Sequence, residues 1–168
     1  MKNIVIYFSR SGNNYVDGNI CDLPVGNTKV IAQRIQEITG VDAFEIIPVK
    51  AYSTDYTTCT EEAKQELNEQ ARPAYQGDIN LAPYDTIYLG YPIWWSTFPM
   101  CVCTFLEHHN GLAGKTIVPF ATHEGSGMGS SIGDLKRLCP QAKICQGVAI
   151  KGSTVAKAKV DGIVHPKF

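Results

Sequence analysis

The chain has 168 residues, a length that suits a single domain covering residues 1–168 with a core of its own. Its 15 Lys and Arg residues nearly balance 16 Asp and Glu residues, and a net charge of -1 argues against a nucleic-acid partner. The sequence contains no apolar run of about 18 residues, which a membrane-spanning helix requires, and no secretory signal at its N-terminus. We therefore expect a cytoplasmic protein without a membrane segment.

Five apolar runs are predicted to be strands, and helical patterns separate them. The run 3–8 is continuously apolar, as in a strand buried on both faces, whereas Asp42 and Glu45 in the second run suit a sheet edge. In chain order we predict strand 3–8, helix 28–39, strand 42–47, a capping box at 58–61 opening a helix over 61–71, strand 86–91, helix 100–109, strand 116–121, helix 131–138 and strand 144–150. The tail allows a short helix near 154–163.

This alternation predicts an α/β fold of three layers, with helices on both sides of a five-stranded parallel sheet. The most apolar strand comes first and the most polar second, which fits a central first strand beside an edge strand. The expected order is 2-1-3-4-5. Ligands of such sheets bind beyond the carboxyl ends of the strands, where the winding reverses.

The six cysteines, at positions 21, 59, 101, 103, 139 and 145, are expected to be free and partly buried thiols. A metal site would have to combine Cys101 and Cys103 with His108 and His109. That spacing fits no common zinc motif, so we predict no metal.

The loop after the first strand contains two turns of the kind that bind phosphate. Ser9, Arg10 and Ser11 precede Gly12, and Gly26, Asn27 and Thr28 open the following helix. Free N–H groups at a helix N-terminus, together with hydroxyl and amide donors, favour phosphate. The motifs GxxxxGK(S/T) and GxGxxG are missing, so a monophosphate fits better than a nucleoside triphosphate or a dinucleotide. An ordinary Ser/Gly turn with an Asn/Thr N-cap explains the same residues without a ligand.

Two further loops leave the same end of the predicted sheet. The second places an aromatic pair at a strand exit, with the candidate residues Pro92, Ile93, Trp94, Trp95 and Ser96. Exposed tryptophans at such a position favour a planar ligand, although one of the two could belong to the core. The third loop is rich in glycine, which lets backbone approach a ligand or simply bend, and offers His123, Glu124, Gly125, Ser126 and Gly127.

Phosphate donors, an aromatic face and a glycine-rich loop together describe a pocket for flavin mononucleotide (FMN). On these residues the chain resembles the flavodoxin family over positions 1 to about 150. The family's phosphate motif reads S/T-x-T/S-G-N-T, and in this chain it looks split into two parts. Residues 9–12 resemble its start and residues 26–28 its end. Residues 14–25 would then be an inserted loop. Asn13 is a competing end of the motif, but no helix is predicted to start there.

The resemblance implies that Trp94 stacks on the isoalloxazine ring, that Pro92 and Ile93 lie along its edge, and that 123–127 forms the third flavin loop. This chain departs from the family pattern in two ways that bear on whether it acts as an electron carrier. The third loop has no tyrosine to cover the other ring face, and the chain lacks the strong negative charge of flavodoxins that shuttle electrons between proteins.

The leading functional hypothesis is an FMN-binding redox protein that transfers electrons to a partner protein or a small quinone-like acceptor, as a monomer or weak homodimer. An alternative is an FMN-dependent NAD(P)H:quinone-type oxidoreductase with His123 as a donor. A phosphate-sensing regulatory module is a third hypothesis, but a receiver needs acidic residues at strand ends where this chain has Phe8 and Tyr91. A serine hydrolase would need G-x-S-x-G, which 125–131 does not provide.

Overall fold

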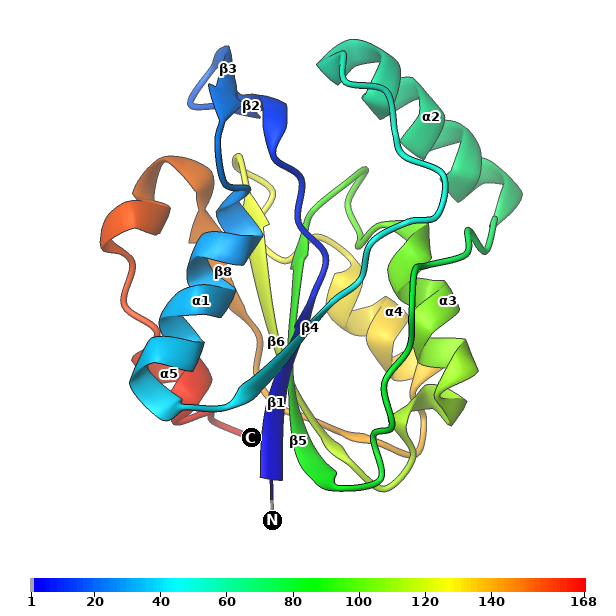
Figure 1. The fold of residues 1–168 in the computed structure, drawn as a ribbon, viewed down its shortest axis with the longest axis vertical. Coiled ribbons are helices and arrows are strands. Elements are labelled where there is room, and N and C mark those ends of the chain that lie inside the picture. The colour runs from blue at the N-terminus through cyan, green and yellow to red at the C-terminus, as the bar shows by residue number, and fades with distance from the viewer. Residues whose placement is uncertain (1) are drawn as a thin grey trace.

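A parallel β-sheet forms the middle layer of the structure, a computed structural model that describes residues 2–168 (Figure 1). The strand order β4-β1-β5-β6-β7, with β8 also beside β6, confirms the predicted order 2-1-3-4-5 and the edge position of the second strand. The strands are β1 (Lys2–Tyr7), β4 (Asp42–Glu45), β5 (Tyr84–Pro92), β6 (Thr116–His123), β7 (Lys143–Ile144) and β8 (Val148–Lys151).

The fifth predicted strand is interrupted, which corrects the continuous run 144–150. Both β7 and β8 pair with β6 in parallel, and the chain leaves the sheet between them. Gly147 lies in this gap, where a Cβ atom would come within 2.6 Å of the Met128 side chain. The lack of a side chain at Gly147 therefore leaves room for Met128, in the segment between β6 and α4.

Helices cover both faces of the sheet, as the sequence predicts. In Figure 1, α1 (Asn27–Thr39) and α5 (Asp161–Val164) lie on one side, and α3 (Met100–His108) and α4 (Ser131–Leu138) lie on the other. Instead of one tail helix at 154–163, the chain forms the 3₁₀ helix η2 (Gly152–Lys157) and then α5; a further 3₁₀ turn, η1 (Asn110–Leu112), follows α3.

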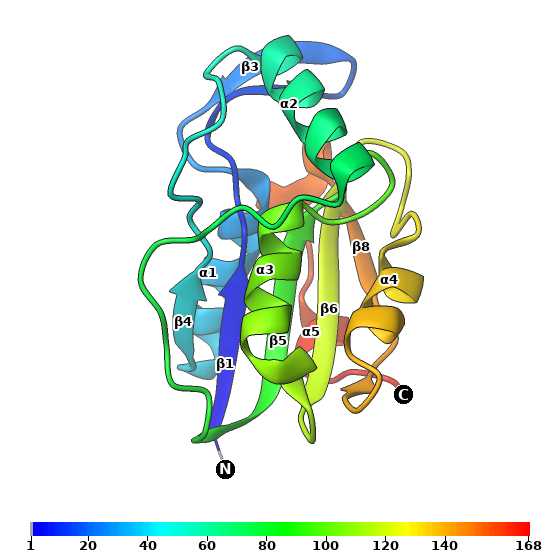
Figure 2. The same cartoon turned by 90° about the vertical axis from the view of Figure 1, so that its right-hand side faces the viewer.

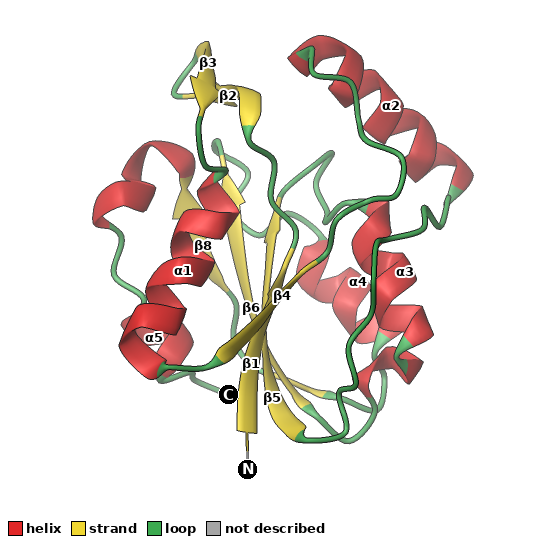
Figure 3. Cartoon of the chain, in the orientation of Figure 1, coloured by secondary structure: helices red, strands yellow, loops and turns green. Residues whose placement is uncertain are grey.

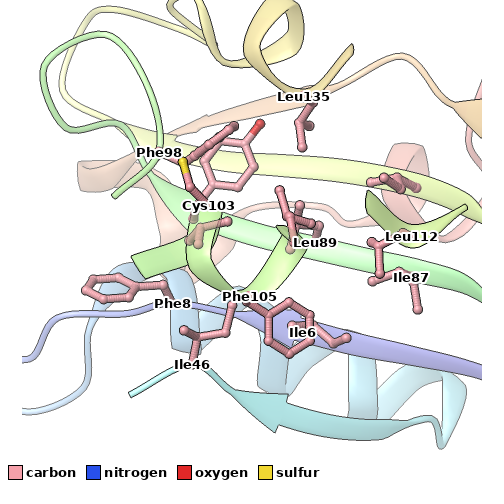
Figure 4. Close-up of a cluster of buried hydrophobic side chains, with 14 of the residues drawn as sticks. Ile6, Phe8, Ile46, Ile87, Leu89, Phe98, Cys103, Phe105, Leu112 and Leu135 are labelled. Carbon is pink, nitrogen blue, oxygen red and sulfur yellow. The ribbon is translucent and has the colours of Figure 1, made fainter. Parts of the chain in front are cut away.

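The larger of two hydrophobic clusters lies between the sheet and α3 and α4 (Figure 4). Ile6 and Leu89 from the sheet and Phe105 from α3 are fully buried in it. On the other face, Val5 and Val118 pack with Ile31 of α1. The two clusters fix the strand ends that carry the candidate loops.

Helix α2 (Tyr56–Glu69) differs from its prediction in its start and in its position. It begins before the predicted capping box, because Asp55 is the N-cap and its side chain accepts a hydrogen bond of 2.9 Å from the Thr58 amide. Figures 1 and 2 show α2 beyond the carboxyl end of the sheet rather than flat against a face. Only Cys59 and Ala63 of this helix are buried.

The predicted inserted loop 14–25 is a β-hairpin. Strands β2 (Gly12–Val16) and β3 (Asn19–Leu23) pair antiparallel and form a sheet of their own at the same end of the molecule as α2 (Figure 3). Asp17 and Gly18 form its turn with φ values of 52° and 82°. Two positive φ angles are typical of a type I′ turn, for which Asp-Gly is a preferred sequence.

The cysteines agree with the expectation of free thiols: Cys21 is half-buried and the other five are buried, all unpaired within residues 2–168. None of the helices in this described range is both long enough and apolar enough to cross a membrane.

Candidate functional site

A cavity of about 360 Å³ lies at the carboxyl ends of β1, β5 and β6. The three predicted loops contribute to its wall, and the hairpin and α2 complete it. The lining residues from the predicted set are Arg10, Asn27, Thr28, Pro92, Ile93, Trp94, His123, Glu124, Gly125 and Ser126.

Some predicted residues lie outside this cavity. Ser9, Ser11 and Gly26 line a separate hollow of about 110 Å³ with Lys29 and Glu45. Trp95 faces a second cavity, Ser96 lies in the turn after Trp94, and Gly127 bonds to His123.

The start of α1 is held in place by Ser9. Its hydroxyl oxygen accepts a hydrogen bond of 3.1 Å from the Lys29 amide, and the helical ladder begins with Val30 N–H bonded to Gly26 O at 3.1 Å. The amides of Asn27 and Thr28 precede this ladder, so they form the free end of the helix. A Cβ atom at Gly26 would lie 2.2 Å from Ser9 Oγ, so only glycine fits here. Ser9 and Gly26 thus position the cavity-lining residues.

The hydroxyl of Thr28 is buried and lies 2.8 Å from the Thr122 hydroxyl. Either hydroxyl can be the donor. When Thr122 donates, the Thr28 proton is free for a second acceptor. Thr122 is a cavity residue that the site prediction missed.

Arg10 brings a positive charge to the cavity wall. Its Nε donates to Asn13 O and its Nη2 to Thr54 O, each at 3.2 Å. These two carbonyls fix the side chain between the hairpin base and the segment before α2. The remaining guanidinium N–H groups stay available to an anion.

Trp94 and Trp95 begin a tight turn but have different surroundings. Trp94 lines the cavity and contacts Phe8 and Tyr52 edge-on, with ring centroids 5.1 Å away in both cases. Trp95 is 47% exposed, and its Nε1 donates to Thr60 O at 2.8 Å. Trp95 and Ser96 have φ values of 52° and 71°, a left-handed conformation that is unfavourable for both residue types.

His123 organises the third loop. Its Nδ1 accepts hydrogen bonds from the amides of Gly125 at 2.9 Å and Gly127 at 3.1 Å. Because Nδ1 is an acceptor, the neutral ring carries its proton on Nε2. The imidazole therefore holds the glycine-rich turn and keeps one N–H as a donor.

Glu124 has a buried oxygen that lacks a hydrogen-bond partner among residues 2–168. This atom is Oε1, whereas Oε2 accepts a 3.3 Å hydrogen bond from the Asp17 amide at the hairpin tip. A buried carboxylate oxygen without a partner is costly. Oε1 packs against Gly152, where a Cβ atom would come within 2.3 Å of it, so this oxygen is turned into the protein.

The site prediction also missed Asn14, Tyr15 and Tyr56, which line the cavity from the hairpin and α2. The two tyrosine rings stack with centroids 6.0 Å apart and planes at 26°, and Asn13 Oδ1 accepts the Tyr56 amide at 2.7 Å. Burial raises the pKa of Tyr56, so it is a protonated donor at neutral pH. These tyrosines supply aromatic surface that the third loop lacks. The Asp-Gly turn was the available signal for the hairpin that carries Tyr15.

A second cavity of about 260 Å³ adjoins the first and shares Arg10, Asn14, Tyr56, Ile93 and Trp94 with it. Its further lining residues are Cys59, Thr60, Ala63 and Trp95. Burial raises the pKa of the Cys59 thiol, so this group is protonated and a poor nucleophile at neutral pH.

Among curated proteins no match was found. A candidate flavoprotein from Bacteroides eggerthii has 31% identity and a TM-score of 0.73, with 97% of this chain and 98% of that chain covered. A second, from Bacteroides uniformis, has 30% identity and a TM-score of 0.71, covering 92% and 94%.

A flavoprotein in complex with FMN from Lactobacillus acidophilus has the same fold, with 20% identity, a TM-score of 0.67, and coverage of 93% of this chain and 97% of that one. The model of the flavodoxin family matches residues 2–165. Because this match spans almost all 168 residues, the chain belongs to the flavodoxin family.

Proposed function

We propose that the protein binds one FMN non-covalently in the cavity of about 360 Å³ at the carboxyl ends of β1, β5 and β6, and transfers electrons through it. Membership of the flavodoxin family supports FMN as the cofactor. The same-fold flavoprotein from Lactobacillus acidophilus was crystallised with FMN. Bound FMN supplies one- and two-electron redox chemistry, and the protein supplies binding, orientation and electrostatics.

The observation that carries the proposal is that the N-terminus of α1 and an aromatic wall border the same cavity. The amides of Asn27 and Thr28, the Thr28 hydroxyl and Arg10 suit a phosphate. Trp94 and Tyr56 offer apolar surface for a flat ring.

Glu124 bears on how FMN would be oriented. Its carboxylate belongs to the part of the cavity wall that the third loop forms. A phosphate would be repelled by this carboxylate, so the phosphate belongs at the Arg10 and Thr28 part of the cavity. Ser9 and Gly26, in the neighbouring hollow, act by holding the start of α1.

The phosphate assignment is tested by titrating FMN and riboflavin into apo-protein. Thr28→Ala should weaken FMN more than riboflavin, because only FMN carries the phosphate, whereas Thr28→Ser should keep the preference for FMN. Equal weakening of both flavins by Thr28→Ala would place the phosphate elsewhere. Failure of wild-type apo-protein to bind either flavin would refute FMN binding altogether.

The second cavity favours a second candidate function, an FMN-dependent oxidoreductase that reduces a small quinone-like acceptor. It is lined by Ile93, Trp94, Trp95 and Ala63, which suit a flat apolar molecule beside the flavin pocket. A carrier instead needs a partner protein. Steady NAD(P)H-dependent quinone reduction by the pure protein would favour the enzyme, and turnover only after adding a reductase would favour the carrier.

A further inference from the structure

Asp78, His108 and His109 meet at the end of the molecule opposite the hairpin. His108 is the last residue of α3 and His109 is its C-cap, whereas Asp78 belongs to the segment between α2 and β5. Figures 1 and 2 show the C-terminal end of α3 far from the β2–β3 hairpin. The hairpin residues Asn14 and Tyr15 line the cavity proposed for FMN, and none of Asp78, His108 and His109 does.

Each of the two imidazole rings points its Nε2 atom at the Asp78 carboxylate. His108 Nε2 lies 2.9 Å from Asp78 Oδ2, and His109 Nε2 lies 2.8 Å from Asp78 Oδ1. One potential ligand atom from each of the three residues lies within 4.8 Å of the others. Tetrahedral coordination at about 2.1 Å places neighbouring ligand atoms about 3.4 Å apart, so small side-chain rotations suffice for all three to reach one ion.

The cluster is held in place from both sides. The Tyr75 hydroxyl donates to Asp78 Oδ1 at 3.0 Å, and the segment carrying both residues is tied down by Gln76 N–H bonded to Ile47 O at 2.7 Å. The side chain of His109 is only 14% exposed, and its ring lies 4.5 Å from that of Phe105. His108 is 58% exposed and leaves the cluster open to solvent.

The directions of the three side chains suit one shared ion. The two imidazole rings lie 5.1 Å apart with an interplanar angle of 86°, and each points its Nε2 at a different oxygen of the same carboxylate. A divalent ion can accept both nitrogen lone pairs and the carboxylate charge at once. Imidazole and carboxylate are the ligands that zinc and related ions accept.

We propose that Asp78, His108 and His109 form a binding site for one divalent transition-metal ion of the zinc type. The three side chains leave at least one coordination position for water at the exposed side, next to His108. The bound ion joins the segment before β5 to the end of α3, so it should stabilise the folded chain.

The test uses the full-length protein, with its flavin, after treatment with a chelator and dialysis. Zinc is titrated calorimetrically into wild type, His108→Ala, Asp78→Asn and His165→Ala. His165 is an exposed histidine outside the cluster and provides the matched control. We expect one zinc per wild-type chain. Zinc binding should be weakened at least about tenfold in His108→Ala and in Asp78→Asn, and should be unchanged in His165→Ala.

Thermal melting gives a second readout. Zinc should raise the melting temperature of wild type and His165→Ala but not of His108→Ala, whose exposed side chain can be removed without opening the core. The proposal is overturned if wild type shows no saturable zinc binding, or if His108→Ala binds zinc as tightly as wild type. It is likewise overturned if the calorimetric heat of zinc binding disappears when the flavin is removed, because the ion then binds the cofactor.

Discussion

Trp94 and Trp95 show what can and cannot be predicted at the scale of single residues. The sequence predicts that the pair leaves a strand at the ligand end of the sheet, and this position is correct. Which ring faces the cavity depends on a turn in which Trp95 and Ser96 both adopt positive φ. Neither residue type signals such a conformation, since glycine and asparagine are usual there. The resemblance to the family assigns the stacking role to Trp94, and the structure adds that Trp94 lines the first cavity whereas Trp95 lines only the second of the two.

Trp94→Ala should weaken FMN binding by about 1–3 kcal/mol and increase flavin fluorescence, because a large aromatic surface is removed from the pocket wall. Trp95→Ala should have a smaller effect on both, since that ring is half-exposed and bonds to Thr60. Flavin titration followed by fluorescence measures the two quantities. The reverse ranking would assign the stacking role to Trp95.

At the scale of elements, the strands and most helices follow from apolar periodicity, whereas the hairpin and α2 do not. The segment Tyr15-Val16-Asp17-Gly18-Asn19-Ile20 carries a hairpin signal, Asp-Gly between apolar residues, that a loop interpretation overlooks. The placement of α2 is harder to predict. Its capping box pointed to the wrong start, and its few apolar residues give it little surface with which to cover a sheet.

Tyr15 connects the hairpin to α2, which gives a test of the hairpin's role. Tyr15→Ala should weaken FMN binding by about 0.5–1.5 kcal/mol, because it removes the stack with Tyr56 at the cavity wall. Tyr15→Phe keeps the ring and should bind FMN as wild type does. Because the hairpin forms a sheet of its own, the melting temperature of the apo-protein should change little in both variants. A large loss of stability in Tyr15→Ala would make the hairpin part of the folding core.

At the scale of the whole molecule, the strand order is predictable because the most apolar strand lies inside the sheet, next to the most polar strand at the edge. Contacts between residues that lie far apart in the sequence cannot be predicted in this way. Asp78 precedes His108 by 30 residues and Tyr56 follows Asn13 by 43, and no periodicity relates either pair. Such contacts depend on how loops cross the ends of the sheet.

Close packing between central strands predicts a marked stability effect at Gly90. A Cβ atom there would lie 2.2 Å from the Phe120 ring on β6, so Gly90→Ala should destabilise the fold by roughly 1–3 kcal/mol in urea denaturation. Gly133→Ala is the matched control, because it lies within α4 with open space around the new methyl group. That substitution should stabilise the protein by up to about 1 kcal/mol. Equal effects of the two substitutions would contradict the packing argument.

The thiols report on the integrity of the whole core. Burial raises the pKa of Cys101 to about 12 and those of Cys103 and Cys139 to about 11, so these groups contain very little reactive thiolate at neutral pH. Iodoacetamide should therefore modify half-buried Cys21 first in the folded protein, and these three only after denaturation. Mass spectrometry of peptides from native and unfolded samples checks this order. Rapid native labelling of Cys103 would show that the core opens.

The separate sheet formed by the hairpin has a consequence for amide hydrogen exchange. An isolated two-stranded ribbon is only marginally stable in water, and β2 and β3 make their ladder bonds with each other alone. Their ordering then depends on the contacts at Tyr56, Glu124 and whatever fills the cavity beneath. Exchange protection in residues 12–23 should consequently follow cofactor occupancy, while the amides of β1 and β5 stay protected in either state.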